Sequence, residues 1–220
     1  MEYFRIGGAL KVGWEKYKSH VVFVWITIGT IIVVSGIFGG FEEMTKDIWL
    51  LSFTISLASA FFSIVMQIGV TRLYLDLIDT DTEGQLRTLF SHSHLFFRYL
   101  IASILMGFLV LVGLILFVIP GIYWGLKYQF LPCLIVDKDL GIADAFKESG
   151  QITQGVKWQL FGFSLAMIGI NILGAVALGI GLLITLPVTI LAHVFVYRKL
   201  STRIMLVPVT EAPIAETKTA

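Results

Sequence analysis

Long apolar stretches alternate with short polar ones along this chain, a pattern typical of a polytopic membrane protein. A helix needs about 20 mostly apolar residues to cross about 30 Å of hydrocarbon. The run from Trp158 to Tyr197 has no charged residue and is too long for one span, so we divide it near its glycine-rich middle. The predicted membrane spans cover residues 21–40, 48–78, 99–119, 122–136, 158–174 and 181–200.

Before each odd-numbered span lies a polar stretch in which apolar residues recur every three or four positions. This spacing predicts amphipathic helices that lie in the headgroup plane. We expect them at residues 4–18, 84–97 and 140–155, the last with Asp139 as its N-cap. The predicted apolar stripes are Ile6, Leu10, Trp14 and Tyr17; Leu86, Leu89, Phe90 and Phe97; and Ile142, Ala145, Phe146, Ser149 and Thr153.

The fold class that follows is an all-α, polytopic membrane bundle. Six transmembrane helices are expected to form three hairpins, and a cytoplasmic amphipathic interfacial helix precedes each hairpin. The alternative is that any cytoplasmic loop between spans tends to be amphipathic, which predicts no common spacing. Residues 1–206 then form a single transmembrane domain. The tail at residues 207–220, which mixes Pro, Thr, Glu and Ala, is expected to be disordered.

The basic residues favour one orientation of these spans. With the amino terminus in the cytoplasm, all but two of the 16 Lys and Arg residues, Lys46 and Lys127, lie on the cytoplasmic side. Six spans then leave both termini in the cytoplasm. Residues 1–20 carry several charges and no apolar core of a cleavable signal peptide, so we expect the first span to remain as an anchor.

Composition excludes several classes of protein. The chain is 57% hydrophobic and 14% charged, far from an ordinary soluble domain, and its net charge of +1 argues against a general nucleic-acid binder. The single cysteine cannot form an internal disulfide. We find no His-Glu-x-x-His, Gly-x-Ser-x-Gly or phosphate-binding glycine motif, so the sequence predicts no catalytic residues, no metal site and no cofactor.

Two sets of charged residues lie near the predicted membrane faces. Arg72, Asp76 and Asp79 are four and three residues apart, so they share one face of the helix that extends the second span. They either guard a cytoplasmic vestibule or form an ordinary ion pair on a solvated helix end. Lys127 lies inside the fourth predicted span, where it either binds a lipid phosphate or extends its ammonium group to the headgroups.

Polar side chains at membrane depth form the remaining candidate site. Asn171 in the fifth span and His193 in the sixth are placed where they could meet across a hairpin, and Gln67 lies in the second span. Interhelical hydrogen bonds explain such residues without a ligand. A polar cavity of a carrier is the alternative, favoured by Pro187, which could kink the sixth span.

Ordered motifs in the second half of the chain carry a family resemblance. They are Pro120–Tyr123, Phe130–Asp137, Gly141–Ser149, Thr153–Gly155, Trp158–Gly162, Gly179–Leu183, Thr185–Pro187 and Tyr197–Leu200, together with Gly13–Lys16 near the start. In this order, from about residue 7 to 203, they resemble a bacterial family of uncharacterised integral membrane proteins. That family is related to the membrane domain fused to glycerophosphoryl diester phosphodiesterases. The resemblance implies six helices in a bacterial inner membrane and no established activity.

These observations predict a non-enzymatic integral membrane protein that acts through lipid or protein contacts in the cytoplasmic leaflet. The expected partners are membrane lipids and either a second copy or another membrane protein, without nucleic acid. The alternative is a small carrier or channel for a lipid or small solute. The residues predicted to contact lipid or to line a polar cavity are Arg72, Lys127, Asn171 and His193.

Overall fold

The computed structural model describes residues 4–45, 47–80, 88–176 and 181–206, and every regular element in these ranges is a helix. The prediction of an all-α protein is therefore confirmed. The elements are α1 (Ile6–Ser19), α2 (Val21–Thr45), α3 (Trp49–Thr80), α4 (Thr88–Ser91), the 3-10 helix η1 (Ser93–Leu95), α5 (Phe96–Leu116), α6 (Val118–Tyr128), α7 (Leu131–Lys138), α8 (Ile142–Ile152), α9 (Lys157–Val176) and α10 (Leu182–Leu206).

Among the described residues, five helices are long and apolar enough to cross a membrane: α2, α3, α5 with η1, α9 and α10. They coincide with five of the six predicted spans, which is compatible with a multi-pass membrane protein. The helix α2 continues to Thr45, five residues beyond the predicted end at 40. It runs through Glu42 and Glu43, so the helix extends past the apolar span.

The fourth predicted span, residues 122–136, is not confirmed as a continuous helix. Two short helices occupy this region, α6 with 11 residues and α7 with 8. Pro132 explains the break, since it has no backbone N–H to donate to the carbonyl of Tyr128 and its ring would clash with that carbonyl. Proline is tolerated at the first turn of α7, where no such bond is required.

The break exposes carbonyl groups at the end of α6, and polar side chains satisfy them. The hydroxyls of Ser149 in α8 and of Thr153, the C-cap of α8, donate to the carbonyl of Lys127 at 3.0 and 3.2 Å. The amide of Gln129 donates to the carbonyl of Leu126 at 3.2 Å. Ser149 and Thr153 are fully buried, so water does not reach these carbonyl groups and the side-chain hydroxyls satisfy them instead.

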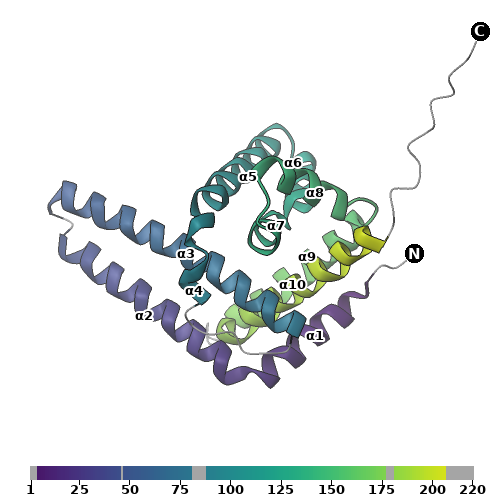
Figure 1. The fold of residues 1–220 in the computed structure, drawn as a ribbon, viewed down its shortest axis with the longest axis horizontal. Helices are drawn as coiled ribbons and strands as arrows, with labels where there is room; N and C mark the ends of the chain where they lie inside the picture. Colours follow the sequence, from purple (N-terminus) through teal and green to yellow (C-terminus); the bar gives the residue numbers. More distant parts are fainter. Residues whose placement is uncertain (1–3, 46, 81–87, 177–180, 207–220) are drawn as a thin grey trace, which may run out of the picture.

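The short helix α7 lies in the core, with α3, α5 and α8 packed around it (Figure 1). Leu134 and Ile135 in α7 are fully buried, as is Phe130 just before it. The guanidinium of Arg98, at the start of α5, donates to both the carboxylate and the carbonyl of Asp139. The chain therefore returns along α5 through α6 and α7, as two short helices instead of one long one.

Asp139 is not the N-cap predicted for the helix at 140–155. It follows α7 in the left-handed region, with φ of 51°, a conformation that commonly ends helices. Gly141 is the N-cap of α8 instead. The apolar stripe predicted for this helix is largely right, because Ala145, Ser149 and Thr153 are buried, although the helix ends at Ile152, before residue 155.

The first predicted interfacial helix forms as α1 and packs on α10. Three of the four residues of its predicted stripe lie against the core, since Tyr17 is buried and Ile6 and Leu10 are partly buried. Its buried residues are Ala9, Gly13 and Tyr17, whereas Trp14 of the predicted stripe is 43% exposed. A Cβ on Gly13 would lie 2.5 Å from the carbonyl oxygen of Val188, so only glycine permits this approach. The predicted stripe omits the buried small residues Ala9 and Gly13, because small side chains contribute little to a hydrophobic pattern.

The second predicted interfacial helix, residues 84–97, is not continuous in the part of the chain that the structure describes. Only α4 and η1, of four and three residues, lie there, and Phe97 already belongs to α5. Residues 84–87, like the predicted tail at 207–220, lie outside the described ranges.

The helices α2 and α3 lie side by side and project from the rest of the molecule (Figure 1). Large apolar side chains remain exposed along this projection, among them Val33, Phe53 and Leu57. Such exposed apolar side chains are compatible with a hydrocarbon environment. Near the base of the projection, Phe23 of α2 packs in one apolar cluster with Leu73 of α3.

We predict that Gly13→Ala weakens the docking of α1 and lowers the free energy of unfolding by about 1–3 kcal/mol, because the added methyl group meets the backbone of α10. The matched control is Gly7→Ala in the same helix, where a Cβ meets nothing within 4 Å. That change should be neutral or stabilise by up to about 1 kcal/mol. Denaturant unfolding in detergent micelles measures both, and equal effects would contradict the close contact.

Candidate functional site

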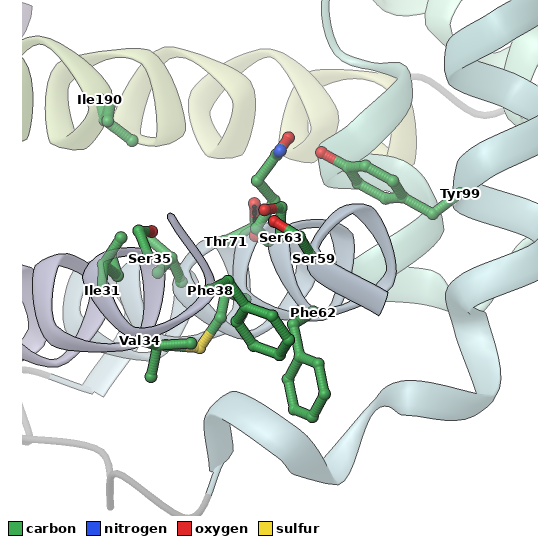
Figure 2. A pocket seen from close by; sticks show the side chains of 13 residues that line it. Ile31, Val34, Ser35, Phe38, Ser59, Phe62, Ser63, Thr71, Tyr99 and Ile190 are labelled. Carbon is green, nitrogen blue, oxygen red and sulfur yellow. Dashed lines mark hydrogen bonds between the residues drawn. The ribbon is translucent and has the colours of Figure 1, made fainter. Parts of the chain in front are cut away.

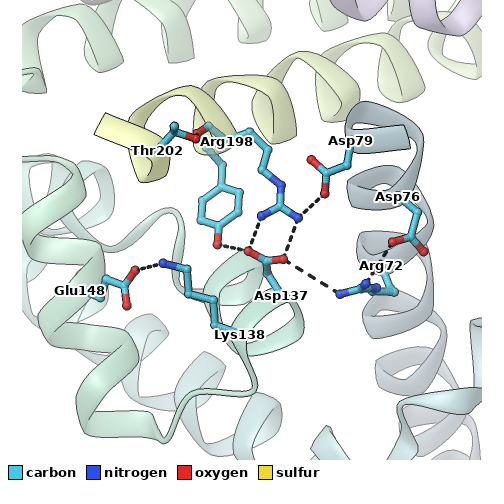
Figure 3. Close-up of polar contacts among 9 residues, drawn as sticks. Arg72, Asp76, Asp79, Asp137, Lys138, Glu148, Arg198 and Thr202 are labelled. Carbon is cyan, nitrogen blue, oxygen red and sulfur yellow. Dashed lines mark hydrogen bonds and ion pairs between the residues drawn. The ribbon is translucent and has the colours of Figure 1, made fainter. Parts of the chain in front are cut away.

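Charged and polar side chains of α3, α7 and α10 meet in one cluster (Figure 3). The carboxylate of Asp137 accepts two hydrogen bonds from the guanidinium of Arg198, at 2.6 and 2.7 Å. It also accepts one from the hydroxyl of Tyr197 at 2.7 Å. Arg198 donates in addition to Asp79. We call this set the charged junction: Arg72, Asp76, Asp79, Asp137, Tyr197 and Arg198.

Arg72, a residue singled out by sequence, lies in the charged junction. It pairs with Asp76 at 3.1 Å within α3, which is the ordinary ion pair that the spacing predicted. Its guanidinium also lies 4.0 Å from the carboxylate of Asp137, on another helix. The face shared by Arg72, Asp76 and Asp79 therefore contacts α7 and α10 rather than solvent alone.

The charges of the junction indicate a structural role rather than an anion site. Three carboxylates face two guanidinium groups, so the cluster has no positive charge left for a phosphate. The side chain of Asp137 is only 8% exposed, and both of its oxygens have donors. Breaking such a pair leaves an unpaired buried charge, which is strongly destabilising. Asp137 therefore fixes the end of α7 to the other two helices.

Asp137 and Arg198 were not among the residues predicted from the sequence to form a site. A signal for both exists in the sequence. Asp137 is the first charge after the apolar run Leu131–Val136, and Arg198 is the first charge after the uncharged run that begins at Trp158. Charges that end apolar runs on different helices lie at similar depth, which makes them natural partners.

Lys127 lies in a second site, between α6, α8 and the start of α9. The cavity there has a volume of about 460 Å³, and Lys127, Lys147 and Lys157 line it with Tyr123 and Tyr128. Lys157 donates a hydrogen bond to the hydroxyl of Tyr123, and the ammonium of Lys127 lies 4.9 Å from the ring centre of Tyr128. We call this cavity the Lys127 pocket.

The Lys127 pocket differs from the charged junction in its charge balance. Within the described residues, none of its three lysines forms an ion pair with a carboxylate. The polar residues that complete its lining, Gln151 and Gln154, are neutral. Three ammonium groups around one concave surface favour an anion with several oxygen atoms, such as a phosphate.

Among the described residues, Asn171 and His193 contact different partners rather than each other. The amide of Asn171 donates to the hydroxyl of Thr189 at 3.3 Å. This pairing and the close approach of Gly174 to Thr185 fix the register between α9 and α10. His193 follows Thr189 by one turn and therefore lies beyond the level of Asn171, with its ring 4.9 Å from that of Phe130.

The Ser91–His94 segment offers no metal site. The rings of His92 and His94 are 6.0 Å apart, and the hydroxyl of Ser91 lies 2.7 Å from Nδ1 of His92. Burial, and then the charge of Arg72, lower the pKa of His92. Across the described residues, no group of three or more His, Cys, Asp and Glu side chains is placed to hold a metal ion.

We predict that Asp137→Asn lowers the free energy of unfolding by about 3 kcal/mol, since it leaves Arg198 with only Asp79 as a charged partner. Asp76→Asn is the matched control, because its pair with Arg72 is 30% exposed on both sides and contributes about 1 kcal/mol or less. Denaturant unfolding in micelles measures both variants. A loss for Asp137→Asn no larger than the control's would contradict the buried junction.

A double-mutant cycle isolates the Asp137–Arg198 interaction. Replacing both residues with leucine removes both charges, so we expect the double variant to lose less stability than the two single variants summed. An additive result would show that the two side chains do not interact.

Comparison with known proteins finds a family match for part of the chain. Residues 108–204 match the model of a family described as "Protein of unknown function (DUF975)". Uncharacterized proteins of Mycobacterium bovis and Mycobacterium tuberculosis are 32% identical to the chain over 103 residues. That match covers 46% of this chain and 31% of each relative. No solved structure matches the chain significantly.

These matches support the resemblance to an uncharacterised family, but they do not support a relation to the phosphodiesterase membrane domain. The family match includes Asp137 and Arg198 of the charged junction and the whole of the Lys127 pocket, while Arg72 and Asp79 lie outside it. Through residues 108–204, the chain is thus similar to proteins whose function is also unassigned.

Proposed function

We propose that this protein is a non-enzymatic membrane protein that binds an anionic phospholipid at its cytoplasmic face, through the Lys127 pocket. The observation that carries the proposal is the gathering in one cavity of three lysines that have no paired carboxylate among the described residues. Lipid phosphates provide the complementary charge. A basic side chain near an anionic membrane surface contributes about 1 kcal/mol to such binding.

The position of the pocket supports a lipid rather than a soluble ligand. Lys157 is the first residue of α9, one of the helices apolar enough to span a membrane. The next residue, Trp158, is 86% exposed. Tryptophan and lysine at the end of an apolar helix are typical of the boundary between hydrocarbon and headgroups.

The arrangement of helix ends supports the proposed orientation, with both termini in the cytoplasm of a bacterial cell and the spans in its inner membrane. The ion pair of Arg98 with Asp139 and the charged junction bring together the start of α5 and the ends of α3 and α10. Basic residues therefore gather at one end of the molecule, as positively charged cytoplasmic loops do. Under this proposal, α6 and α7 complete a sixth crossing, and the interfacial helices α1 and α8 precede the first and the third of three hairpins.

A small carrier or channel is the alternative function. The candidates that suggested it do not form one cavity: Lys127 lines its own pocket, Asn171 contacts Thr189, and His193 packs against Phe130. A second copy of the chain, or another membrane protein, remains the proposed protein partner, and the exposed apolar side chains of α2 and α3 are compatible with either.

We predict that Lys127→Gln with Lys147→Gln weakens retention of phosphatidylglycerol about tenfold or more, because two favourable charge interactions are lost. The protein is placed in nanodiscs that contain phosphatidylglycerol and phosphatidylcholine, and bound lipid is counted by native mass spectrometry. The matched control, Lys11→Gln with Lys18→Gln, removes two exposed lysines of α1. Equal retention in the two double variants would contradict the proposal.

A second measurement distinguishes lipid from free phosphate as the ligand. Inorganic phosphate at millimolar concentration should displace little phosphatidylglycerol, because it cannot bury acyl chains against the protein. Complete displacement by inorganic phosphate would show that the pocket binds a soluble phosphate instead.

A further inference from the structure

A cavity of about 430 Å³ lies between α2 and α3 and is bordered by one residue each of α5 and α10 (Figure 2). Its apolar lining includes Phe38 and Phe62, whose rings are tilted by 38° with their centres 5.0 Å apart. The cavity is separate from the Lys127 pocket, and the two share no lining residue.

One wall of this cavity is polar. Ser59, Ser63, Gln67 and Thr71 follow one another at intervals of four residues, so they form one row along α3. In Figure 2, Ser59, Ser63 and Thr71 are grouped on one side of the cavity, with Tyr99 of α5 nearby. The row of 12 residue steps extends over about 18 Å along the helix axis. We call it the α3 polar row.

The α3 polar row lies inside an apolar helix, where unsatisfied polar groups are costly. Residues 49–70 carry no charge, and α3 is one of the helices able to span a membrane. Thr71 donates to the carbonyl of Gln67 at 2.8 Å and is satisfied. In the part of the chain that the structure describes, the side chains of Ser59, Ser63 and Gln67 make no hydrogen bond.

Packing between the helices of one chain therefore does not explain these residues. In membrane proteins, serine and glutamine are commonly satisfied by hydrogen bonds to a neighbouring helix. Here the facing residues of α2 include the apolar Ile31, Val34 and Phe38. Ser35 of α2 also lines the cavity, but among the described residues its hydroxyl forms no hydrogen bond with the α3 polar row. Ser63 and Gln67 instead remain exposed towards the cavity.

The chemistry of the lining selects the kind of ligand. Hydroxyl and amide groups line the polar wall, and no Asp, Glu, Lys, Arg or His lines the cavity. A charged headgroup would lose its hydration there without a counter-charge. An uncharged group that carries hydroxyl and ester oxygens gains hydrogen bonds from the polar row, while the aromatic and aliphatic walls accommodate acyl chains.

We propose that this cavity binds a neutral glycerolipid of the diacylglycerol class, with its glycerol and ester oxygens against the α3 polar row. Ser63 and Gln67 donate hydrogen bonds to these oxygens. The acyl chains extend along the exposed apolar surface of α2 and α3. This site is independent of the anionic lipid site at Lys127.

The test uses the whole chain in phosphatidylcholine nanodiscs that contain a few per cent of diacylglycerol. Bound diacylglycerol per protein is counted by native mass spectrometry. Ser63→Phe fills the cavity, and Gln67→Leu removes the amide at similar size; each should lower bound diacylglycerol about tenfold. The matched control is Ser56→Phe, on an exposed position of the same helix that does not line the cavity. It should leave binding unchanged.

Phosphatidylglycerol retention is measured on the same variants and should stay at the wild-type level. Because the two lipids are counted separately, failure of the neutral-lipid site can be distinguished from failure of the Lys127 proposal. Two results would overturn the neutral-lipid site. One is equal diacylglycerol binding by Gln67→Leu, Ser56→Phe and the wild type. The other is a change of oligomeric mass in Gln67→Leu without a change in bound lipid, which would make the α3 polar row a contact between copies.

Discussion

The interaction between Asp137 and Arg198 holds the architecture together. A helix of eight residues such as α7 is too short to be stable alone, so its position depends on what binds its two ends. At the start, Pro132 breaks the preceding helix, and the hydroxyls of Ser149 and Thr153 satisfy the carbonyl that the break leaves open. At the end, Asp137 accepts hydrogen bonds from α10. The core of the molecule is built around the segment between these two anchors.

Hydropathy predicted five of the long helices because crossing hydrocarbon requires only length and apolar composition, which are local properties. Hydropathy did not predict the break between α6 and α7, although Pro132 lies in this segment. An apolar segment has the same mean hydropathy whether it forms one helix or two. The contact of Gly13 with α10 escaped the apolar stripe, since a glycine has no side chain to contribute to a hydrophobic pattern. Which helices pack together is not a local property.

Four residues were selected from the sequence. Arg72 lies in the charged junction and Lys127 lines the Lys127 pocket, whereas Asn171 and His193 contact different partners. The difference has a physical reason. A charge near a membrane face must find a partner, a headgroup or water, so its position alone is informative. A polar residue within a span needs only one hydrogen bond, and the register of two helices decides where that bond forms.

The three polar sites of this molecule differ in charge, and this difference organises the functional proposal. The charged junction is neutralised by its own carboxylates, so it serves the fold. The Lys127 pocket keeps an excess of positive charge, and the α3 polar row has no charge at all. Under the two proposals, a phosphate therefore fits the Lys127 pocket, and neutral oxygen atoms fit the cavity beside the α3 polar row.

Alkylation of Cys133 tests the role of the junction most directly. This residue is the only cysteine of the chain, is 4% exposed, and lies one turn before Asp137 in α7. In detergent-solubilised full-length protein, a hydrophilic maleimide should react slowly with Cys133, and Arg198→Gln should accelerate the reaction at least tenfold. Lys199→Gln, at the neighbouring position, should leave the rate unchanged. Rapid labelling of the wild type, or equal rates in all three proteins, would contradict a core held closed by Asp137 and Arg198.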